Sequence, residues 1–110
     1  MKVIKSEESL LEFDNGLVIA GEGDTDCCAH NYLDFTQFEV GQEFPTMTAG
    51  EFFDAVNLKG DGFGLNASDG LPKWCQARSR QNGYYSDRTE LSVLYGGKTI
   101  SLGKLSGEQE

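Results

Sequence analysis

Four glycine-containing pairs divide the chain into short segments and restrict the folds that it can adopt. The pairs are Asn15-Gly16, Asp69-Gly70, Asn82-Gly83 and Gly96-Gly97. Glycine, and less readily asparagine or aspartate, accepts the positive φ angles that tight hairpin turns require. Each pair is therefore predicted to form a corner of an antiparallel sheet, and together they predict a meander of short strands.

Apolar segments flank three of these turns. Residues 10–14 and 17–22 surround the first, residues 63–67 and 73–79 the second, and residues 91–95 and 98–102 the fourth. Residues 32–38 alternate apolar and polar side chains imperfectly, which predicts a further strand in preference to an irregular crossover.

A short helix is predicted between the hairpins. Thr48-Ala49-Gly50-Glu51 has the form of a capping box and is followed by an apolar stretch that begins at Phe52. Pro45 and Gly60 bound the segment on either side.

These elements predict an α+β fold: a single domain over residues 1–110, mostly antiparallel meander, with one short helix. A chain of 110 residues is long enough for one core and too short for two. Residues 106–110 carry nothing apolar to bury and are predicted to form a frayed tail. The core candidates are Phe13, Val18, Phe35, Phe52, Val56, Leu65, Trp74, Val93 and Ile100.

The negative charge is concentrated in one half of the chain. Residues 1–54 contain two basic and twelve acidic side chains, whereas residues 55–110 contain seven basic and six acidic ones, and the total is −9. Such a field repels phosphate backbones and attracts basic surfaces. We therefore expect no direct binding of nucleic acid and a basic surface of a host protein as the partner.

Cysteine usage and the N-terminal residues indicate the compartment. No apolar run reaches the ~20 residues that a membrane span needs, and no secretory signal precedes the first strand. Three cysteines are an odd number for a disulfide framework. A cytoplasmic protein with free thiols and no membrane association is predicted.

Potential metal ligands gather in one segment, residues 24–30, which ends at the only histidine of the chain. In an extended strand Asp26, Cys28 and His30 would share one face, with Cys75 as a fourth ligand from a distant strand. The spacing matches neither the Cys-x₂₋₄-Cys nor the His-x₃₋₅-His pair of structural zinc sites. Small structural cysteines, no cofactor and no catalytic residues are the main prediction, and a metal-binding domain is the alternative.

Cationic and aromatic side chains gather in a second segment, residues 78–88. These residue types dominate binding hot spots. They are also candidates for holding a small anionic or nucleotide-like ligand, which is a further alternative. The candidates in this segment are Arg78, Arg80, Tyr84, Tyr85 and Arg88.

Two passages together resemble a family of small, functionally uncharacterised proteins of phages, mobile elements and bacteria. The motifs are Asp26-Cys27-Cys28 and Gln81-Asn82-Gly83-Tyr84-Tyr85-Ser86, within a likeness that covers residues 10–96. Family members typically carry glutamate or histidine just before Asp-Cys-Cys, where this chain has Gly23-Asp24-Thr25. The resemblance implies a phage or mobile-element origin and carries no assigned activity.

The function predicted from these features is a non-catalytic, acidic protein-binding module. Its form would be a phage-type inhibitor of a host nucleic-acid-binding or defence protein, with an oligomeric state that the sequence leaves open. The acidic candidates for the binding surface are Asp24, Asp26, Asp34 and Glu39.

Overall fold

Antiparallel hairpins make up most of the computed structural model, which describes residues 1–23, 29–81, 83 and 85–110. The strands and the helix, in chain order, are β1 (Val3–Glu7), β2 (Leu10–Phe13), β3 (Val18–Gly23), β4 (His30–Asp34), α1 (Ala49–Ala55), β5 (Asn57–Leu58), β6 (Gly62–Asn66), β7 (Pro72–Arg80), β8 (Arg88–Tyr95), β9 (Lys98–Ser106) and β10 (Glu108–Gln109). The predicted α+β class is confirmed.

Three of the four predicted turns close hairpins. β2 pairs with β3, β6 with β7, and β8 with β9, all in antiparallel register. The glycines at these turns have positive φ angles, with 90° at Gly16, 85° at Gly70, and 59° and 79° at Gly96 and Gly97. Only glycine adopts such angles without steric cost, so the turn chemistry accounts for these hairpins.

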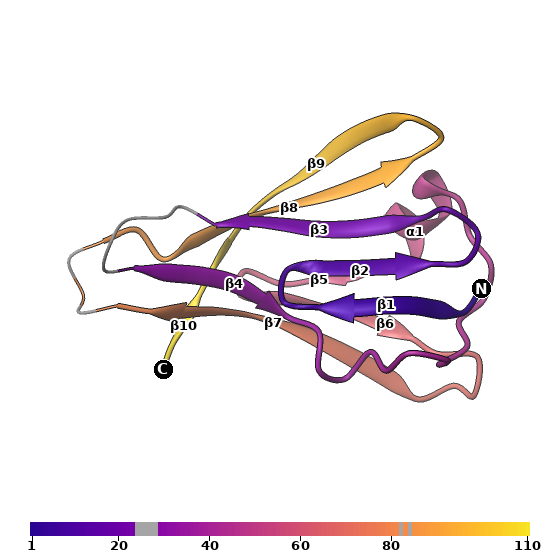
Figure 1. Ribbon diagram of the computed structural model, residues 1–110, viewed down its shortest axis with the longest axis horizontal. Coiled ribbons are helices and arrows are strands. Elements are labelled where there is room, and N and C mark those ends of the chain that lie inside the picture. The colour runs from indigo at the N-terminus through magenta and orange to yellow at the C-terminus, as the bar shows by residue number, and fades with distance from the viewer. Residues whose placement is uncertain (24–28, 82, 84) are drawn as a thin grey trace.

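The hairpins are divided between two sheets (Figure 1). One has the strand order β1-β2-β3-β8-β9. In the other, β7 pairs with β4 along one edge and with β6 and β10 along the opposite edge, and β5 extends β6. The Asn82-Gly83 pair was wrongly predicted as a hairpin corner, because β7 and β8 belong to different sheets; Asn82 itself lies outside the described residues.

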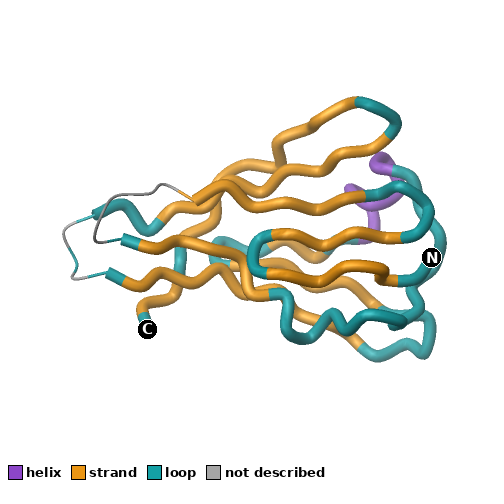
Figure 2. Tube along the Cα trace, in the orientation of Figure 1, coloured by secondary structure: helices purple, strands orange, loops and turns teal. Residues whose placement is uncertain are grey.

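Helix α1 begins as predicted. The Thr48 side chain accepts a hydrogen bond from the Glu51 N–H, and the Glu51 carboxylate accepts one from the Thr48 N–H. This reciprocal capping box satisfies two N–H groups that the first turn leaves unpaired. Phe52, which is fully buried, anchors the helix in the core. Figure 2 shows the helix at the end of the molecule near the N-terminus.

The core lies between the sheets and is rich in phenylalanine. Phe63 forms ring contacts with Phe35, Phe38 and Phe52 at centroid distances of 6.0–6.1 Å. Of the predicted core residues, those that are buried are Phe13, Phe35, Phe52, Leu65 and Val93.

The other core predictions were wrong in degree. Val18, Val56 and Trp74 are only half-buried, and Ile100 is 39% exposed. Val18 and Trp74 occupy outward positions of their strands, because successive side chains point to opposite faces. Ile100 lies near the free end of the β8–β9 hairpin, which extends beyond the other sheet (Figure 1).

Two glycines of β3 allow the first sheet to approach β4. A Cβ at Gly23 would lie 2.1 Å from the carbonyl oxygen of Asn31, and a Cβ at Gly21 would lie 2.6 Å from the Leu33 side chain. A larger residue at Gly23 would meet backbone that has no room to move. The position of β4 between β3 and β7 therefore depends on this glycine.

Residues 106–110 are ordered, in contrast to the frayed tail expected from the sequence. Glu108 and Gln109 pair in parallel with Arg78 and Ser79 of β7. Gly107 is buried, and its N–H donates to the Asp87 carbonyl at 2.6 Å. Backbone pairing holds the tail in place without apolar side chains.

Candidate functional site

The candidate site lies on the outer face of β4 and β7. Along β4, Asn31 and Leu33 point into the protein and are buried, whereas His30, Tyr32 and Asp34 alternate with them on the outside. Tyr32 is directly opposite Arg78 of β7. Antiparallel pairing thus brings outward side chains of two distant segments together.

Asp34 and Arg78 form the least exposed ion pair of this face. The Arg78 Nε donates to Asp34 Oδ2 at 2.7 Å, and the Thr36 N–H donates to Oδ1 at 3.0 Å. Burial by itself raises the pKa of Asp34, but the hydrogen bonds from Arg78 and Thr36 outweigh it, and the net pKa is lowered. Both residues were predicted as binding candidates, and the structure pairs them with each other.

Tyr32 connects β4 to the C-terminal segment. Its hydroxyl bonds to the Glu110 carboxylate, which also accepts from Arg80 at 2.9 Å. Burial, together with the bond to the Glu110 anion, raises the pKa of Tyr32 to about 12. The same contacts, first the bond from Tyr32 and then that from Arg80, lower the pKa of Glu110.

His30 is part of the same surface. Its Nε2 lies 2.6 Å from Glu8 Oε1, and its ring stacks on Tyr32 with centroids 4.9 Å apart. The imidazole is therefore held between an acidic side chain of the β1–β2 turn and an aromatic ring of its own strand.

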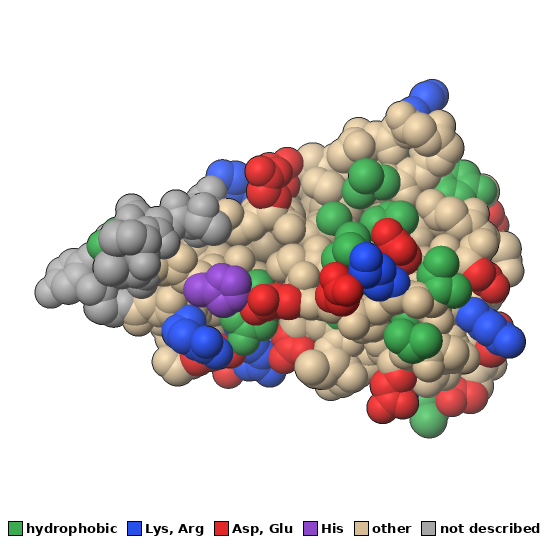
Figure 3. All heavy atoms as spheres, in the orientation of Figure 1, with side chains coloured by type: hydrophobic (Ala, Val, Ile, Leu, Met, Phe, Trp, Pro, Cys, Tyr) green, Lys and Arg blue, Asp and Glu red, His purple; other side chains and the backbone are tan. Residues whose placement is uncertain are grey.

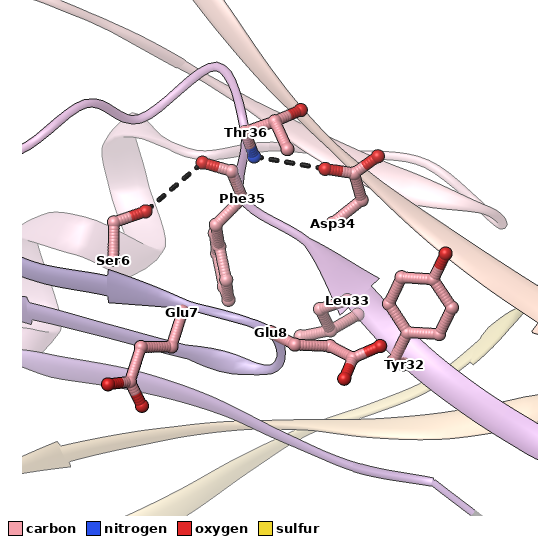
Figure 4. Close-up of a pocket in the computed structure, with 8 residues that line it drawn as sticks. All are labelled: Ser6, Glu7, Glu8, Tyr32, Leu33, Asp34, Phe35 and Thr36. Atoms are coloured by element: carbon pink, nitrogen blue, oxygen red, sulfur yellow. Dashed lines mark hydrogen bonds between the residues drawn. The ribbon is translucent and has the colours of Figure 1, made fainter.

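A hollow of about 230 Å³ lies between the end of β1 and β4 (Figure 4). It combines apolar side chains with three carboxylates, those of Glu7, Glu8 and Asp34. The lining residues are Ser6, Glu7, Glu8, Tyr32, Leu33, Asp34, Phe35 and Thr36. Figure 3 shows His30 and neighbouring acidic and basic side chains on this face of the molecule.

The predicted metal cluster is not assembled by its described members. Cys75 is fully buried on the inner face of β7, whereas the His30 side chain is 49% exposed on the outer face of β4. Burial raises the pKa of the Cys75 thiol, which keeps it protonated. Asp26 and Cys28 lie outside the described residues, and within the described ranges no three potential ligands come together.

The predicted anion-binding segment is also divided. Arg78 and Arg80 are on the outer face of β7 and each is paired with a carboxylate, while Arg88 begins β8 in the other sheet and lies 3.5 Å from Asp87. Tyr85 donates its N–H to Gln81 Oε1 at 2.8 Å.

The remaining predicted binding residues do not join the hollow. Glu39 is exposed beside a separate shallow depression that includes Glu43 and Asp69. Asp24, Asp26 and Tyr84 lie outside the described residues. Of the acidic candidates, Asp34 alone is placed in the hollow.

Sequence reasoning missed the adjacent Glu7 and Glu8 and also Tyr32, which is distant from them in the sequence and meets them only in the folded chain. It also missed a buried polar network beneath the β7–β8 connection. Ser79 donates to Asn31 Oδ1 at 2.6 Å, and Gln81 Nε2 donates to both Ser79 Oγ and the Ser86 carbonyl. Polar residues at inward strand positions would have been the available signal.

No helix in the described part of the chain is long and apolar enough to cross a membrane. No family model, no curated protein and no solved structure matches the chain.

Proposed function

We propose that the protein is a non-catalytic binding module whose hollow beside β4 accepts a lysine or arginine side chain of a basic partner protein. The observation that carries this proposal is the lining of the hollow by the carboxylates of Glu7, Glu8 and Asp34 beside the half-buried Tyr32 ring. Long basic side chains combine an apolar stem with a charged head, and this combination fits such a lining.

The chemistry of the hollow favours a cation over an anion. The half-buried Tyr32 ring supplies apolar surface for the stem, whereas Leu33 and Phe35 are buried beneath the hollow. The face of an aromatic ring also attracts cations. Glu7 is the most available carboxylate, since its ion pair with Lys5 has a length of 3.9 Å and both side chains are well exposed.

The partner proposed is a cytoplasmic host protein with a basic, nucleic-acid-binding surface. The net charge of −9 would accelerate encounter with such a surface and would repel nucleic acid itself. By occupying a basic groove the module would compete with nucleic acid, as a phage-type inhibitor does. Its affinity should fall as salt concentration rises.

The test is a titration of isotope-labelled protein with a lysine- and arginine-containing peptide, followed by NMR. We expect amide shifts at Glu7, Glu8 and residues 32–36, and weaker binding at high salt. Glu7→Gln combined with Glu8→Gln should weaken binding about tenfold, equivalent to ~1.4 kcal/mol. Asp54→Asn is the matched control, because Asp54 is exposed on α1 and outside the hollow. Equal affinity of the double variant and the control protein would refute the proposal.

A further inference from the structure

The strand edges of the two sheets differ in how they are protected. The edge of β1 is covered by the β4–α1 connection: Val3 N–H donates to the Gln42 carbonyl at 3.0 Å, and Gly41 N–H to the Val3 carbonyl at 2.8 Å. The edge of β4 that faces away from β7 is bonded at Leu33 by Ser9. Unpaired strand edges readily recruit further strands, and covering them prevents this.

The outer edge of β9 has no such cover. β9 is the last strand of its sheet, and no described segment pairs with it on the side away from β8. Residues 98–101 are exposed, and Figure 1 shows the β8–β9 hairpin at the margin of the molecule. The last part of the strand is covered: Leu105 is buried in the core, and the Ser106 N–H donates to the carbonyl of Gly60, in the β5–β6 connection, at 2.8 Å.

The turn geometry defines which backbone groups are open. The two-residue turn at Gly96 and Gly97 makes Tyr95 and Lys98 the first hydrogen-bonded pair of the hairpin. In an antiparallel ladder alternate residues bond to alternate sides. The N–H and C=O groups of Thr99 and Ser101 therefore point away from β8.

Side chains along this edge define the chemistry of a partner. Lys98 and Ile100 share one face by strand alternation, and Ile100 is 39% exposed. Residues 98–106 contain two lysines and no acidic side chain, in a protein of net charge −9. This strand is thus a cationic element with an exposed apolar side chain.

We propose that the outer edge of β9 binds an extended acidic segment of another protein as a sixth strand of the first sheet. Thr99 and Ser101 would supply the main-chain hydrogen bonds. In the antiparallel orientation, an apolar side chain of the partner would lie opposite Ile100, and a carboxylate two residues later would lie opposite Lys98. Strand addition of this type uses main-chain bonds for affinity and alternate side chains for specificity.

The length of the edge limits the strength of this interaction. Leu91 pairs with Gly103 and Ser92 with Ser101, so Leu102 is an extra, bulged residue. A bulge disrupts the ladder, and pairing would end there. An interface of about four residues belongs to the weak, transient class.

This inference is independent of the hollow beside β4. That site is anionic and formed by side chains, whereas the β9 edge is cationic and formed mainly by backbone. The two sites would therefore engage different segments, and each test can fail without the other.

The probe is an end-blocked peptide with the repeating unit Thr-Val-Thr-Glu-Thr, titrated into isotope-labelled protein and followed by NMR. We expect the largest amide shifts at Thr99 and Ser101. Thr99→Pro removes one outward N–H from an edge position and should weaken binding about tenfold, while Thr99→Val retains the N–H and should bind as the parent does. Lys98→Glu should also weaken binding, and a peptide with lysine in place of glutamate should not bind the parent.

Thermal unfolding of each variant establishes that the domain is still folded. If Thr99→Pro is unfolded, the affinity of Lys98→Glu for the peptide and the affinity of the parent for the lysine-containing peptide test the proposal instead. Absence of shifts at millimolar peptide, shifts confined to residues 32–36, or equal affinity of folded Thr99→Pro and the parent would overturn the proposal. A parent protein that sediments as a dimer, and a folded Thr99→Pro that sediments as a monomer, would overturn it as well, because a second copy of the chain would then occupy this edge.

Discussion

Ser9 forms two backbone-directed hydrogen bonds with Leu33 and thereby joins the two sheets. The Ser9 N–H donates to the Leu33 carbonyl at 3.0 Å, and the Leu33 N–H donates to Ser9 Oγ at 3.0 Å. The Ser9 carbonyl accepts from the Gly21 N–H at 2.8 Å. Ser9 is also a non-glycine residue with a positive φ, of 61°. Ser9, a turn residue with a strained backbone, thus connects β4 with β3.

Replacing Ser9 by alanine should destabilise the domain. Ser9→Ala leaves the Leu33 N–H without an acceptor, which costs about 1–3 kcal/mol, and retains the cost of a positive φ. Ser9→Gly loses the same oxygen but relieves the backbone strain, so its stability should lie between those of Ser9→Ala and the parent. Urea unfolding measures the order, and an unchanged midpoint for Ser9→Ala would contradict this role.

Because β3 lies close to β4 at Gly23, the stability cost of replacing a glycine by alanine should depend strongly on its position. Gly23→Ala would place a Cβ 2.1 Å from the Asn31 carbonyl oxygen. We expect the two sheets to separate locally at a cost of at least ~2 kcal/mol, in the range of other overpacked sites. Gly60→Ala is the control, because a Cβ there meets nothing within 4 Å and its φ is not positive. Similar melting temperatures for the two variants would argue against the close approach.

Ionisation of Tyr32 should depend on Glu110. With its pKa raised to about 12, Tyr32 stays protonated in the folded protein where an ordinary tyrosine, with a pKa of ~10, has ionised. The stability that it contributes is present below pH ~10 and is lost as the pH rises towards 12. Tyrosinate absorbance in Tyr32→Phe assigns the late-titrating group.

The contribution of the Glu110 carboxylate to the Tyr32 pKa can be tested by one substitution. Glu110→Gln should bring the Tyr32 pKa down towards its usual value, since the nearby anion is gone. If the titration curve of Glu110→Gln coincides with that of the parent, the Tyr32–Glu110 bond does not form in solution.

The Asp34–Arg78 pair should contribute stability that is sensitive to acid. Because the pKa of Asp34 is lowered on folding, the contribution is present above the unfolded value of ~3.9 and is lost as the pH falls through the folded value. Arg78→Gln should raise the Asp34 pKa, which carbonyl NMR titration measures directly. Arg88→Gln removes a cation of another sheet and should leave Asp34 unchanged; an equal rise in both variants would indicate a general charge effect.

Local sequence signals predicted the elements whose formation depends on neighbouring residues. The glycine pairs at residues 16, 70 and 96–97 close hairpins as expected, and the Thr48 capping box starts α1. Each turn or capping box involves about four neighbouring residues, so its formation depends little on the rest of the fold. The tail at residues 106–110 had no local signal, and it is ordered by pairing with β7.

The candidate site could be predicted only in part. Asp34 and Arg78 were recognised as binding candidates, but their mutual ion pair depends on a register across 44 residues. His30 and Cys75 were grouped as metal ligands. The two strands pair, but His30 is at an outward position of β4 and Cys75 at an inward position of β7, so their side chains lie on opposite faces of the sheet. Glu7, Glu8 and Tyr32 carried no local signal of a binding site.

The sequence by itself therefore determined three of the hairpin turns, the helix start, the fold class and the excess of negative charge. These follow from backbone preferences and from composition, which need no knowledge of distant partners. Only the tertiary structure decided the division into two sheets, the neighbours of β4 and the composition of the hollow. The physical reason is that strand pairing is non-local: a shift of one residue in register would send Tyr32 and Asp34 to the opposite face.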